Sequence, residues 1–195
     1  MSIDFYEANA EDFFRRSLAI PVIPEHGRFA AMLPPGGRVL DAGCGSGRDA
    51  LAFRELGFEV TATEAAPRLA ALARDHTGLD VQVLRFDEMD WREAFDGIWT
   101  CASLLHAPRE ELPAVVRRLA SGLVPGGVWF MSFKYGTQDR ETPGRRFTDL
   151  DEAGARALLA DAPMLELLSM AVTGDARVER PDERWLSLFC RRRAA

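Results

Sequence analysis

The chain has 195 residues, of which 47% are hydrophobic and 28% are charged, and its formal net charge is −6. A chain of this size and composition can bury a substantial core, and we expect a single domain over residues 1–195. The negative charge and the scattered basic residues argue against a general binder of nucleic acids or membrane surfaces, because both kinds of binding need a clustered positive face.

The cysteines and the start of the chain indicate a cytoplasmic protein. The three cysteines are odd in number, and their spacing fits neither a metal-binding cluster nor a redox-active pair, so we expect reduced thiols and no bound metal. The first residues do not form a secretory signal, and no apolar stretch approaches the roughly 18 residues of a membrane span. We therefore expect no membrane partner.

The first 33 residues precede the predicted core, which occupies residues 34–195. Within this N-terminal segment, residues 12–18 predict a helix that places Phe13, Phe14 and Leu18 on one side. We therefore expect a helical segment ahead of the core.

From residue 34 onwards, short apolar or β-branched runs alternate with longer helical patterns. Strands are predicted at residues 38–42, 58–63, 81–86, 96–101, 127–134, 164–171 and 184–191. Helices are predicted at residues 48–56, 67–76, 109–122 and 150–161. This alternation is typical of an α/β fold with a parallel sheet and helices on both faces. Because helices drop out toward the end, we expect the last strands to form a hairpin.

The most informative segment is Asp41-Ala42-Gly43-Cys44-Gly45-Ser46-Gly47, at the end of the first predicted strand. Its alternating glycines suit a backbone that turns sharply and lies against a ligand, and the helix that follows favours an anionic group at its start. A dinucleotide fingerprint would need a third glycine at position 48, where the chain has Arg48. A phosphate loop is also excluded, because no Gly-Lys-Ser/Thr sequence follows.

This segment resembles motif I of the class I S-adenosylmethionine-dependent methyltransferases, in particular the small bacterial type. The run from Phe95 to His106 and the turn Leu123-Val124-Pro125-Gly126-Gly127 extend the resemblance from about residue 35 to residue 135. The resemblance implies S-adenosylmethionine as the cofactor and a Rossmann-like seven-stranded sheet with the order 3-2-1-4-5-7-6, in which strand 7 is antiparallel. It also implies that residues 1–33 cover the cofactor site as a partial lid, with Tyr6 and Phe13 as candidates to close it.

Ligands of open α/β sheets bind beyond the carboxyl ends of the strands, so the residues that end the first four strands are the candidates. The resemblance assigns Asp41 to the glycine loop or the cofactor amino group, with a turn cap as the alternative. Glu64 is assigned to the ribose hydroxyls, with a helix N-cap as the alternative. The full set of candidate cofactor residues is Asp41, Gly43, Cys44, Gly45, Gly47, Arg48, Glu64, Ala65, Phe86, Asp87, Met89, Cys101, Ala102 and Ser103.

The candidate for acid–base chemistry is His106, which follows the fourth strand. A base helps methyl transfer when the acceptor is a hydroxyl, a thiol or a protonated amine. The alternative is that His106 caps the next segment or only lines the pocket. Lys134 and Tyr135 are candidates to face the acceptor, whereas Trp99 is expected to pack in the core.

We expect a methyltransferase that acts on a small molecule, as a monomer or a homodimer without a nucleic-acid partner. The chain has no long insertions, and no Asn/Asp-Pro-Pro-Tyr/Phe run follows the fourth strand, which argues against base and glutamine substrates. Two alternatives stay open at this point. One is a non-catalytic protein that binds S-adenosylmethionine, and the other is a nucleotide-dependent oxidoreductase, against which the missing third glycine counts.

Overall fold

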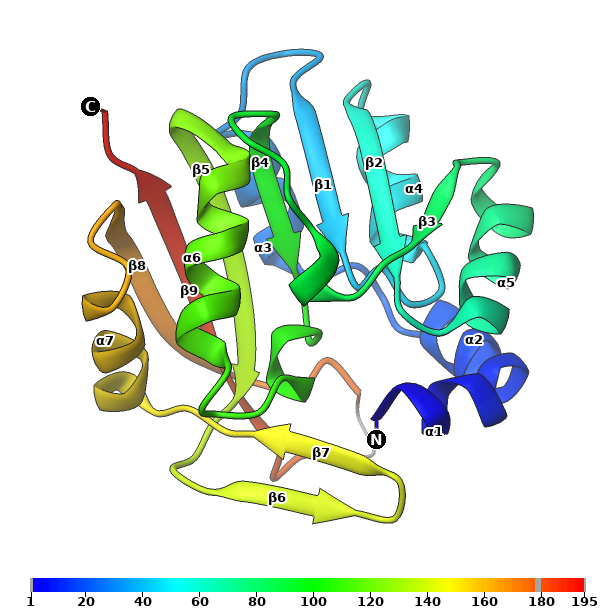
Figure 1. Cartoon of the computed structure of the whole chain (residues 1–195). Coiled ribbons are helices and arrows are strands. Elements are labelled where there is room, and N and C mark those ends of the chain that lie inside the picture. The colour runs from blue at the N-terminus through cyan, green and yellow to red at the C-terminus, as the bar shows by residue number, and fades with distance from the viewer. Residues whose placement is uncertain (1, 178–179, 195) are drawn as a thin grey trace.

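The computed structural model describes residues 2–177 and 180–194, and its main feature is a mixed sheet with the order β3-β2-β1-β4-β5-β9-β8 (Figure 1). Strands β1 to β5 are parallel, whereas β9 runs antiparallel to both β5 and β8. When the strands of this sheet are numbered 1 to 7 along the chain, the order becomes 3-2-1-4-5-7-6 and strand 7 is antiparallel, so both predictions are confirmed. Its strands are β1 (Arg38–Ala42), β2 (Glu59–Glu64), β3 (Val81–Val83), β4 (Phe95–Thr100), β5 (Leu123–Lys134), β8 (Leu165–Gly174) and β9 (Arg184–Arg192).

Helices cover both faces of this sheet, as predicted. Successive strand residues point to opposite faces, so Leu40 packs in the cluster under α6 and α7 while Val39 packs with Phe29 and Phe53 from α3 and α4. The helices are α1 (Ser2–Ala8), α2 (Ala10–Leu18), α3 (Pro24–Ala30), α4 (Arg48–Glu55), α5 (Pro67–Thr77), α6 (Leu112–Gly122) and α7 (Glu152–Ala160), with short 3-10 turns η1 (Phe86–Glu88) and η2 (Leu104–His106).

The N-terminal segment divides between two places in the fold. Helices α1 and α2 pack against α5, near the carboxyl ends of β1 and β2 (Figure 1). Helix α3 instead covers the sheet, because Phe29 is fully buried against Trp99 and Val39. The lid prediction can therefore concern only α1 and α2, which we call the lid, and the prediction that all of residues 1–33 lie outside the core is corrected for α3.

A second sheet was not predicted. It is the antiparallel hairpin of β6 (Asp139–Thr142) and β7 (Arg145–Thr148), which lies beyond the carboxyl end of β5 (Figure 1). Its residues are mostly charged and show no apolar alternation, so the sequence gives no strand signal there. The hairpin reaches across to α1 and η2.

Two predicted boundaries are wrong for identifiable reasons. The strand predicted at 81–86 ends at Val83, because its partner β2 ends at the paired residue Glu64. The helix predicted from residue 109 begins at Leu112, because Pro113 is tolerated only in the first turn of a helix. Within the described ranges, no helix is both long enough and apolar enough to cross a bilayer.

Candidate active site

The glycine loop between β1 and α4 is hydrogen-bonded to the end of β2. The backbone N–H groups of Gly43 and Cys44 both donate to the Thr63 carbonyl, at 3.0 and 2.8 Å. Gly43 has a φ of +79°, and a Cβ atom there would lie 2.7 Å from the Cβ of Ser103. Glycine is therefore required at position 43 for both the backbone conformation and the close approach of the β4 exit.

The lid lies directly on this loop. The Phe13 ring of α2 would be 3.3 Å from a Cβ atom at Gly45, where φ is +59°. The Ser17 and Ser46 hydroxyl oxygens are hydrogen-bonded at 2.8 Å, which joins the same helix to the loop. Tyr6 of α1 packs edge-on against Phe13, with the two ring centroids 4.8 Å apart. The aromatic side of the lid therefore faces the glycine loop.

Glu64 ends β2 beside the loop and is 8% exposed. One carboxylate oxygen accepts from the Gly45 N–H at 3.1 Å, and the other accepts from the Ala66 N–H at 3.0 Å. Burial raises the pKa of Glu64, while the N–H groups of Ala66, Gly45 and Ala65 oppose this shift. A carboxylate has about four lone-pair sites, so these three N–H groups leave room for a further hydroxyl donor.

Asp41 ends β1 and is 2% exposed, and its Oδ2 atom has no hydrogen-bond partner among the described residues. Burial, followed by the nearby Asp49 carboxylate, raises the pKa of Asp41 well above its usual range. A buried carboxyl oxygen without a partner is costly, and it suits a ligand that brings a hydrogen-bond donor. The site thus fits a cofactor with an amino group at this position.

The sequence did not single out Asp49, which organises the start of α4. Its carboxylate binds the Arg48 guanidinium at 2.8 and 3.0 Å and accepts from Trp99 Nε1 at 2.9 Å. Arg48 also donates to the Ile20 carbonyl at 3.3 Å. The structure therefore places Arg48 in an internal ion pair, and its predicted contact with a ligand stays a prediction.

Of the three predicted residues at the exit of β4, Ser103 reaches the glycine loop, whereas Ala102 and Cys101 contact Ser132 of β5. The Ala102 N–H donates to Ser132 Oγ at 2.8 Å, and Ser103 Oγ donates to the Ala42 carbonyl at 2.7 Å. Ala102 adopts a φ of +53°, which is unusual for a residue with a side chain. Burial raises the pKa of both Cys44 and Cys101, so these thiols stay protonated and unreactive at neutral pH.

The three predicted residues that follow β3 lie in different environments in the structure. The Phe86 ring lies 3.7 Å from a Cβ atom placed on Gly43, so it reaches the loop. Asp87 lies at the surface in an ion pair with Arg85. Met89 is buried in the core with Leu119 and Phe95, so it packs beneath α6 and does not line the loop. The prediction that Met89 covers the cofactor is corrected, because an unbranched side chain there fills the core.

His106 lies under the lid with both ring nitrogens in contact. Nδ1 is 2.8 Å from the Arg146 carbonyl oxygen, which can only accept, so Nδ1 carries the proton. Nε2 is 2.8 Å from the Tyr6 hydroxyl and accepts from it. Burial lowers the pKa of His106 to about 4, so the ring is neutral at pH 7.

Two other predicted acceptor residues already have partners. Lys134 forms an ion pair with Glu183, and burial lowers its pKa to about 8. The Tyr135 hydroxyl donates to Glu152 at 3.0 Å. Lys134 lies 5.9 Å from the centroid of the Phe147 ring, so it borders the β6–β7 hairpin.

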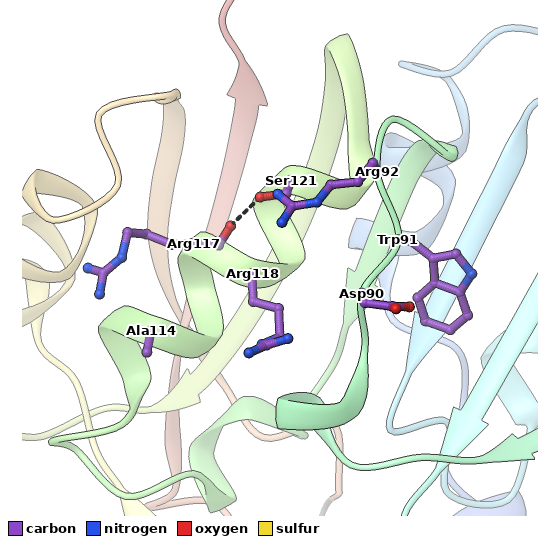
Figure 2. Close-up of a pocket in the computed structure, with 7 residues that line it drawn as sticks. All are labelled: Asp90, Trp91, Arg92, Ala114, Arg117, Arg118 and Ser121. Atoms are coloured by element: carbon purple, nitrogen blue, oxygen red, sulfur yellow. Dashed lines mark hydrogen bonds between the residues drawn. The ribbon is translucent and has the colours of Figure 1, made fainter.

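A cleft of about 280 Å³ lies elsewhere, between α6 and the segment that precedes β4 (Figure 2). Trp91 and the three arginines Arg92, Arg117 and Arg118 are among its lining residues. Residues 90–92 lead into the amino end of β4, whereas the glycine loop follows the carboxyl end of the parallel strand β1. The cleft therefore belongs to the opposite edge of the sheet and is separate from the loop.

Comparisons with known proteins agree with this geometry. Residues 39–127 match the family described as a methyltransferase domain. A ubiquinone biosynthesis O-methyltransferase of Xanthomonas campestris pv. campestris (strain B100) is 38% identical over 105 residues, which are 50% of this chain and 43% of that protein. The chain therefore spans less than half the length of this curated relative.

Two solved structures share the fold. The 1,6-didemethyltoxoflavin-N1-methyltransferase of Burkholderia thailandensis, with bound S-adenosylhomocysteine, has a TM-score of 0.77 at 22% identity and covers 98% of this chain and 87% of its own. The [4+2]-cyclase SpnF has a TM-score of 0.76 at 18% identity and covers 98% of this chain and 95% of its own.

The sheet order places the glycine loop and the carboxylates at the ends of β1 and β2 within a Rossmann-like fold, which the two solved structures share. The match over residues 39–127 agrees with the resemblance of motif I to methyltransferases.

Proposed function

We propose that the protein transfers a methyl group from S-adenosylmethionine to a small-molecule acceptor. The observation that carries this proposal is the buried, unpartnered Oδ2 atom of Asp41 beside a glycine loop whose Gly45 N–H is bound by Glu64. The B. thailandensis neighbour, which holds S-adenosylhomocysteine, supports the same ligand. Asp41 would hold the amino group, and Glu64 would hold the ribose hydroxyls.

When bound, S-adenosylmethionine supplies a methyl group on a positively charged sulfur. The protein has to hold the acceptor in line with that group and exclude competing water. Phe13 and Tyr6 of the lid place apolar rings over the loop, which supports the second task. No residue needs to form a covalent intermediate.

The first acceptors to test are phenols, because the matched Xanthomonas relative is named as an O-methyltransferase. The free Cys44, Cys101 and Cys190 support a reducing location, so we propose the cytoplasm as the site of action. A monomer or a homodimer remains our prediction for the oligomeric state.

The test is calorimetric titration of the protein with S-adenosylhomocysteine. We expect Glu64→Gln to weaken binding about 5- to 100-fold, because a charged acceptor of the ribose hydroxyls is lost. Glu59→Gln is the matched control, since Glu59 is an exposed residue at the other end of β2. Unchanged binding to Glu64→Gln would remove the ribose assignment, and no binding to the folded wild type would remove the methyltransferase proposal.

The second candidate is a protein that binds the cofactor without transferring its methyl group. The similar fold of a [4+2]-cyclase supports keeping it, because the same scaffold carries different chemistry there. Binding of S-adenosylmethionine without formation of S-adenosylhomocysteine from any phenol of a test panel would favour this candidate.

A further inference from the structure

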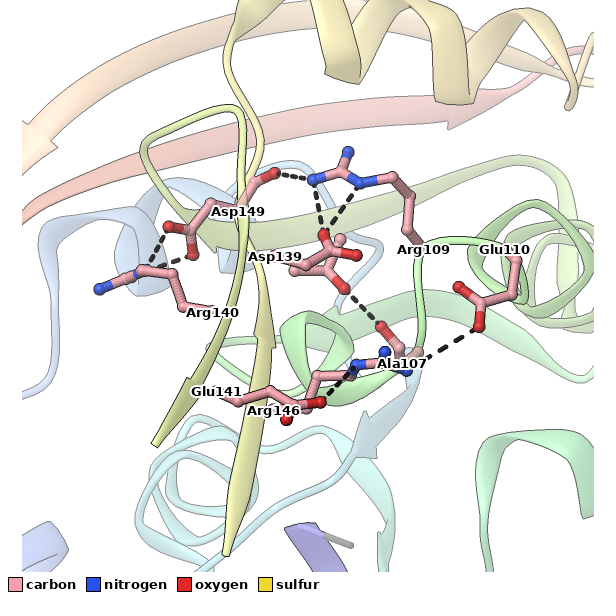
Figure 3. Close-up of polar contacts among 9 residues, drawn as sticks. Ala107, Arg109, Glu110, Asp139, Arg140, Glu141, Arg146 and Asp149 are labelled. Atoms are coloured by element: carbon pink, nitrogen blue, oxygen red, sulfur yellow. Dashed lines mark hydrogen bonds and ion pairs between the residues drawn. The ribbon is translucent and has the colours of Figure 1, made fainter. Parts of the chain in front are cut away.

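Three segments far apart in the sequence meet around His106. Helix α1 contacts β7, where the Arg146 N–H donates to Ser2 Oγ at 3.0 Å. Strand β7 is joined to the η2 segment by the Thr148 hydroxyl, which donates to the Ala107 carbonyl at 2.8 Å (Figure 3). We call α1, the β6–β7 hairpin and η2 together the cap.

The outer side of the hairpin is fixed by ion pairs. Arg109 binds Asp139 at 2.8 Å, and Arg140 binds Asp149 at 2.5 and 3.0 Å (Figure 3). Arg146 lies within 4 Å of two carboxylates, those of Glu110 and Glu141. The ion pairs of Arg109 with Asp139 and of Arg146 with Glu110 join the hairpin to the segment that follows η2.

Arg145 differs from these arginines. It forms no ion pair with any described residue, and a side-chain hydrogen bond joins it to Tyr6. Its buried Nε atom has no hydrogen-bond partner among these residues, which is also true of the Arg146 Nε atom. Its guanidinium carbon lies 4.5 Å from the centroid of the Phe5 ring and 5.2 Å from that of Phe147. A cation held between two rings and lacking a carboxylate can bind an anion from a planar ligand.

Arg145 also lies next to the hydrogen bond between Tyr6 and His106. Burial raises the pKa of Tyr6, and the Arg145 guanidinium opposes this shift. The same positive charge helps to lower the pKa of His106. A positive group, a tyrosine hydroxyl and a neutral imidazole therefore share one side of the cap, and aromatic rings flank them.

We propose that this side of the cap is the acceptor site, and that it takes a planar aromatic acceptor with a negative charge, which pairs with Arg145. Tyr6 contacts the reacting hydroxyl of this acceptor, and His106 acts through Tyr6. The inference rests on the proposed methyltransferase function and adds to it the class of the acceptor.

The proton has a defined route. As the acceptor oxygen forms its bond to the methyl carbon and the methyl–sulfur bond breaks, the O–H proton moves to the Tyr6 oxygen. The Tyr6 proton moves to Nε2 of His106, which becomes positively charged while Nδ1 keeps its proton on the Arg146 carbonyl. The weakly basic imidazole suffices, because the acceptor hydroxyl becomes strongly acidic as the new bond forms.

The first test measures binding without turnover. The protein is saturated with S-adenosylhomocysteine and titrated with 3,4-dihydroxybenzoate or with catechol, which lacks the carboxylate. We expect the carboxylate to bind at least about 10-fold more tightly, and Arg145→Gln to remove this difference. Arg28→Gln is the matched control, because Arg28 also stacks on a phenylalanine, Phe189, at 4.3 Å but packs with α3 on the sheet.

Equal binding of the two probes, or no binding of either to the saturated protein, would overturn the proposed acceptor class. Failure of S-adenosylhomocysteine to bind would instead contradict the proposed function, so the two failures are distinguishable. An equal loss with Arg28→Gln and Arg145→Gln would show that the effect is not specific to the cap.

The second test separates kcat from KM for methylation of 3,4-dihydroxybenzoate. We expect Tyr6→Phe to lower kcat about 100-fold while KM and the Kd of S-adenosylhomocysteine change less than about threefold. We expect His106→Gln to lower kcat to a similar extent, because glutamine can accept from Tyr6 but cannot take up the proton. An unchanged kcat in both variants, or no methylation of this probe by the wild type, would refute the assigned route.

Discussion

Substitution of Gly43 by alanine tests the close approach of the glycine loop and the β4 exit. The new Cβ atom would lie 2.7 Å from Ser103 Cβ, and the residue would keep a φ of +79°. The left-handed conformation costs about 1–2 kcal/mol for a residue with a side chain. Displacing Ser103 also breaks its buried hydrogen bond to the Ala42 carbonyl, at a cost of about 1–3 kcal/mol.

We therefore expect Gly43→Ala to lower the free energy of unfolding by roughly 2–5 kcal/mol, measured by urea denaturation. Gly36→Ala is the matched control, because Gly36 has a φ of +70° and no atom within 4 Å of its hypothetical Cβ. It should cost only the conformational part, about 1–2 kcal/mol. Gly43→Ala should also weaken binding of S-adenosylhomocysteine, whereas Gly36→Ala should not.

Equal losses of stability in the two variants would refute this reasoning, because Ser103 would then not restrict position 43. Full stability of Gly43→Ala with unchanged ligand binding would contradict both the clash and the role of the loop.

Two further predictions concern buried titratable groups. The pKa of His106 is lowered from 6.5 to about 4 in the folded state, so the unfolded chain takes up a proton more readily as the pH falls. The free energy of unfolding is therefore highest above pH 6.5 and falls by about 3 kcal/mol when the pH reaches 4. Measured by urea denaturation, the free energy of unfolding should fall less between pH 7 and pH 4.5 in His106→Gln than in the wild type. An equal fall in the two proteins would contradict the assignment of this pH dependence to His106. Asp49→Asn should lower the free energy of unfolding by about 1–3 kcal/mol, because the half-buried Arg48 loses its partner and the bond to Trp99 is weakened. Asp12→Asn, at an exposed ion pair, should cost less than about 0.5 kcal/mol, and similar losses in thermal or urea unfolding would count against the Asp49 network.

The main sheet was predictable because its signals are local. The apolar or β-branched runs of β1, β2 and β4 and the glycine motif show where strands end and the loop begins, whereas the strand order came from the family resemblance. The hairpin 139–148 could not be found in this way, because its contacts come from distant residues such as Arg109. A charged segment shows no periodicity, and its pairing is decided by the tertiary structure.

The candidate site was also predicted only in part. Asp41 and Glu64 were found because a carboxylate at the end of a parallel strand has a known position. Asp49 and Arg145 were missed because the sequence shows their charge but not their partners. Asp49 is informative only once Trp99 and Arg48 are seen to bind it, and Arg145 only once the neighbouring arginines are seen to be paired.

The contact of Phe13 with Gly45 has a consequence for the order of events in turnover. A ligand lying against the Gly45 backbone must share this space with the Phe13 ring or displace it. Tyr6 packs on the same ring, so an outward movement of α2 would also disturb the group that contacts the acceptor. For the proposed reaction we therefore expect ordered binding, with the methyl donor entering first and its product leaving last.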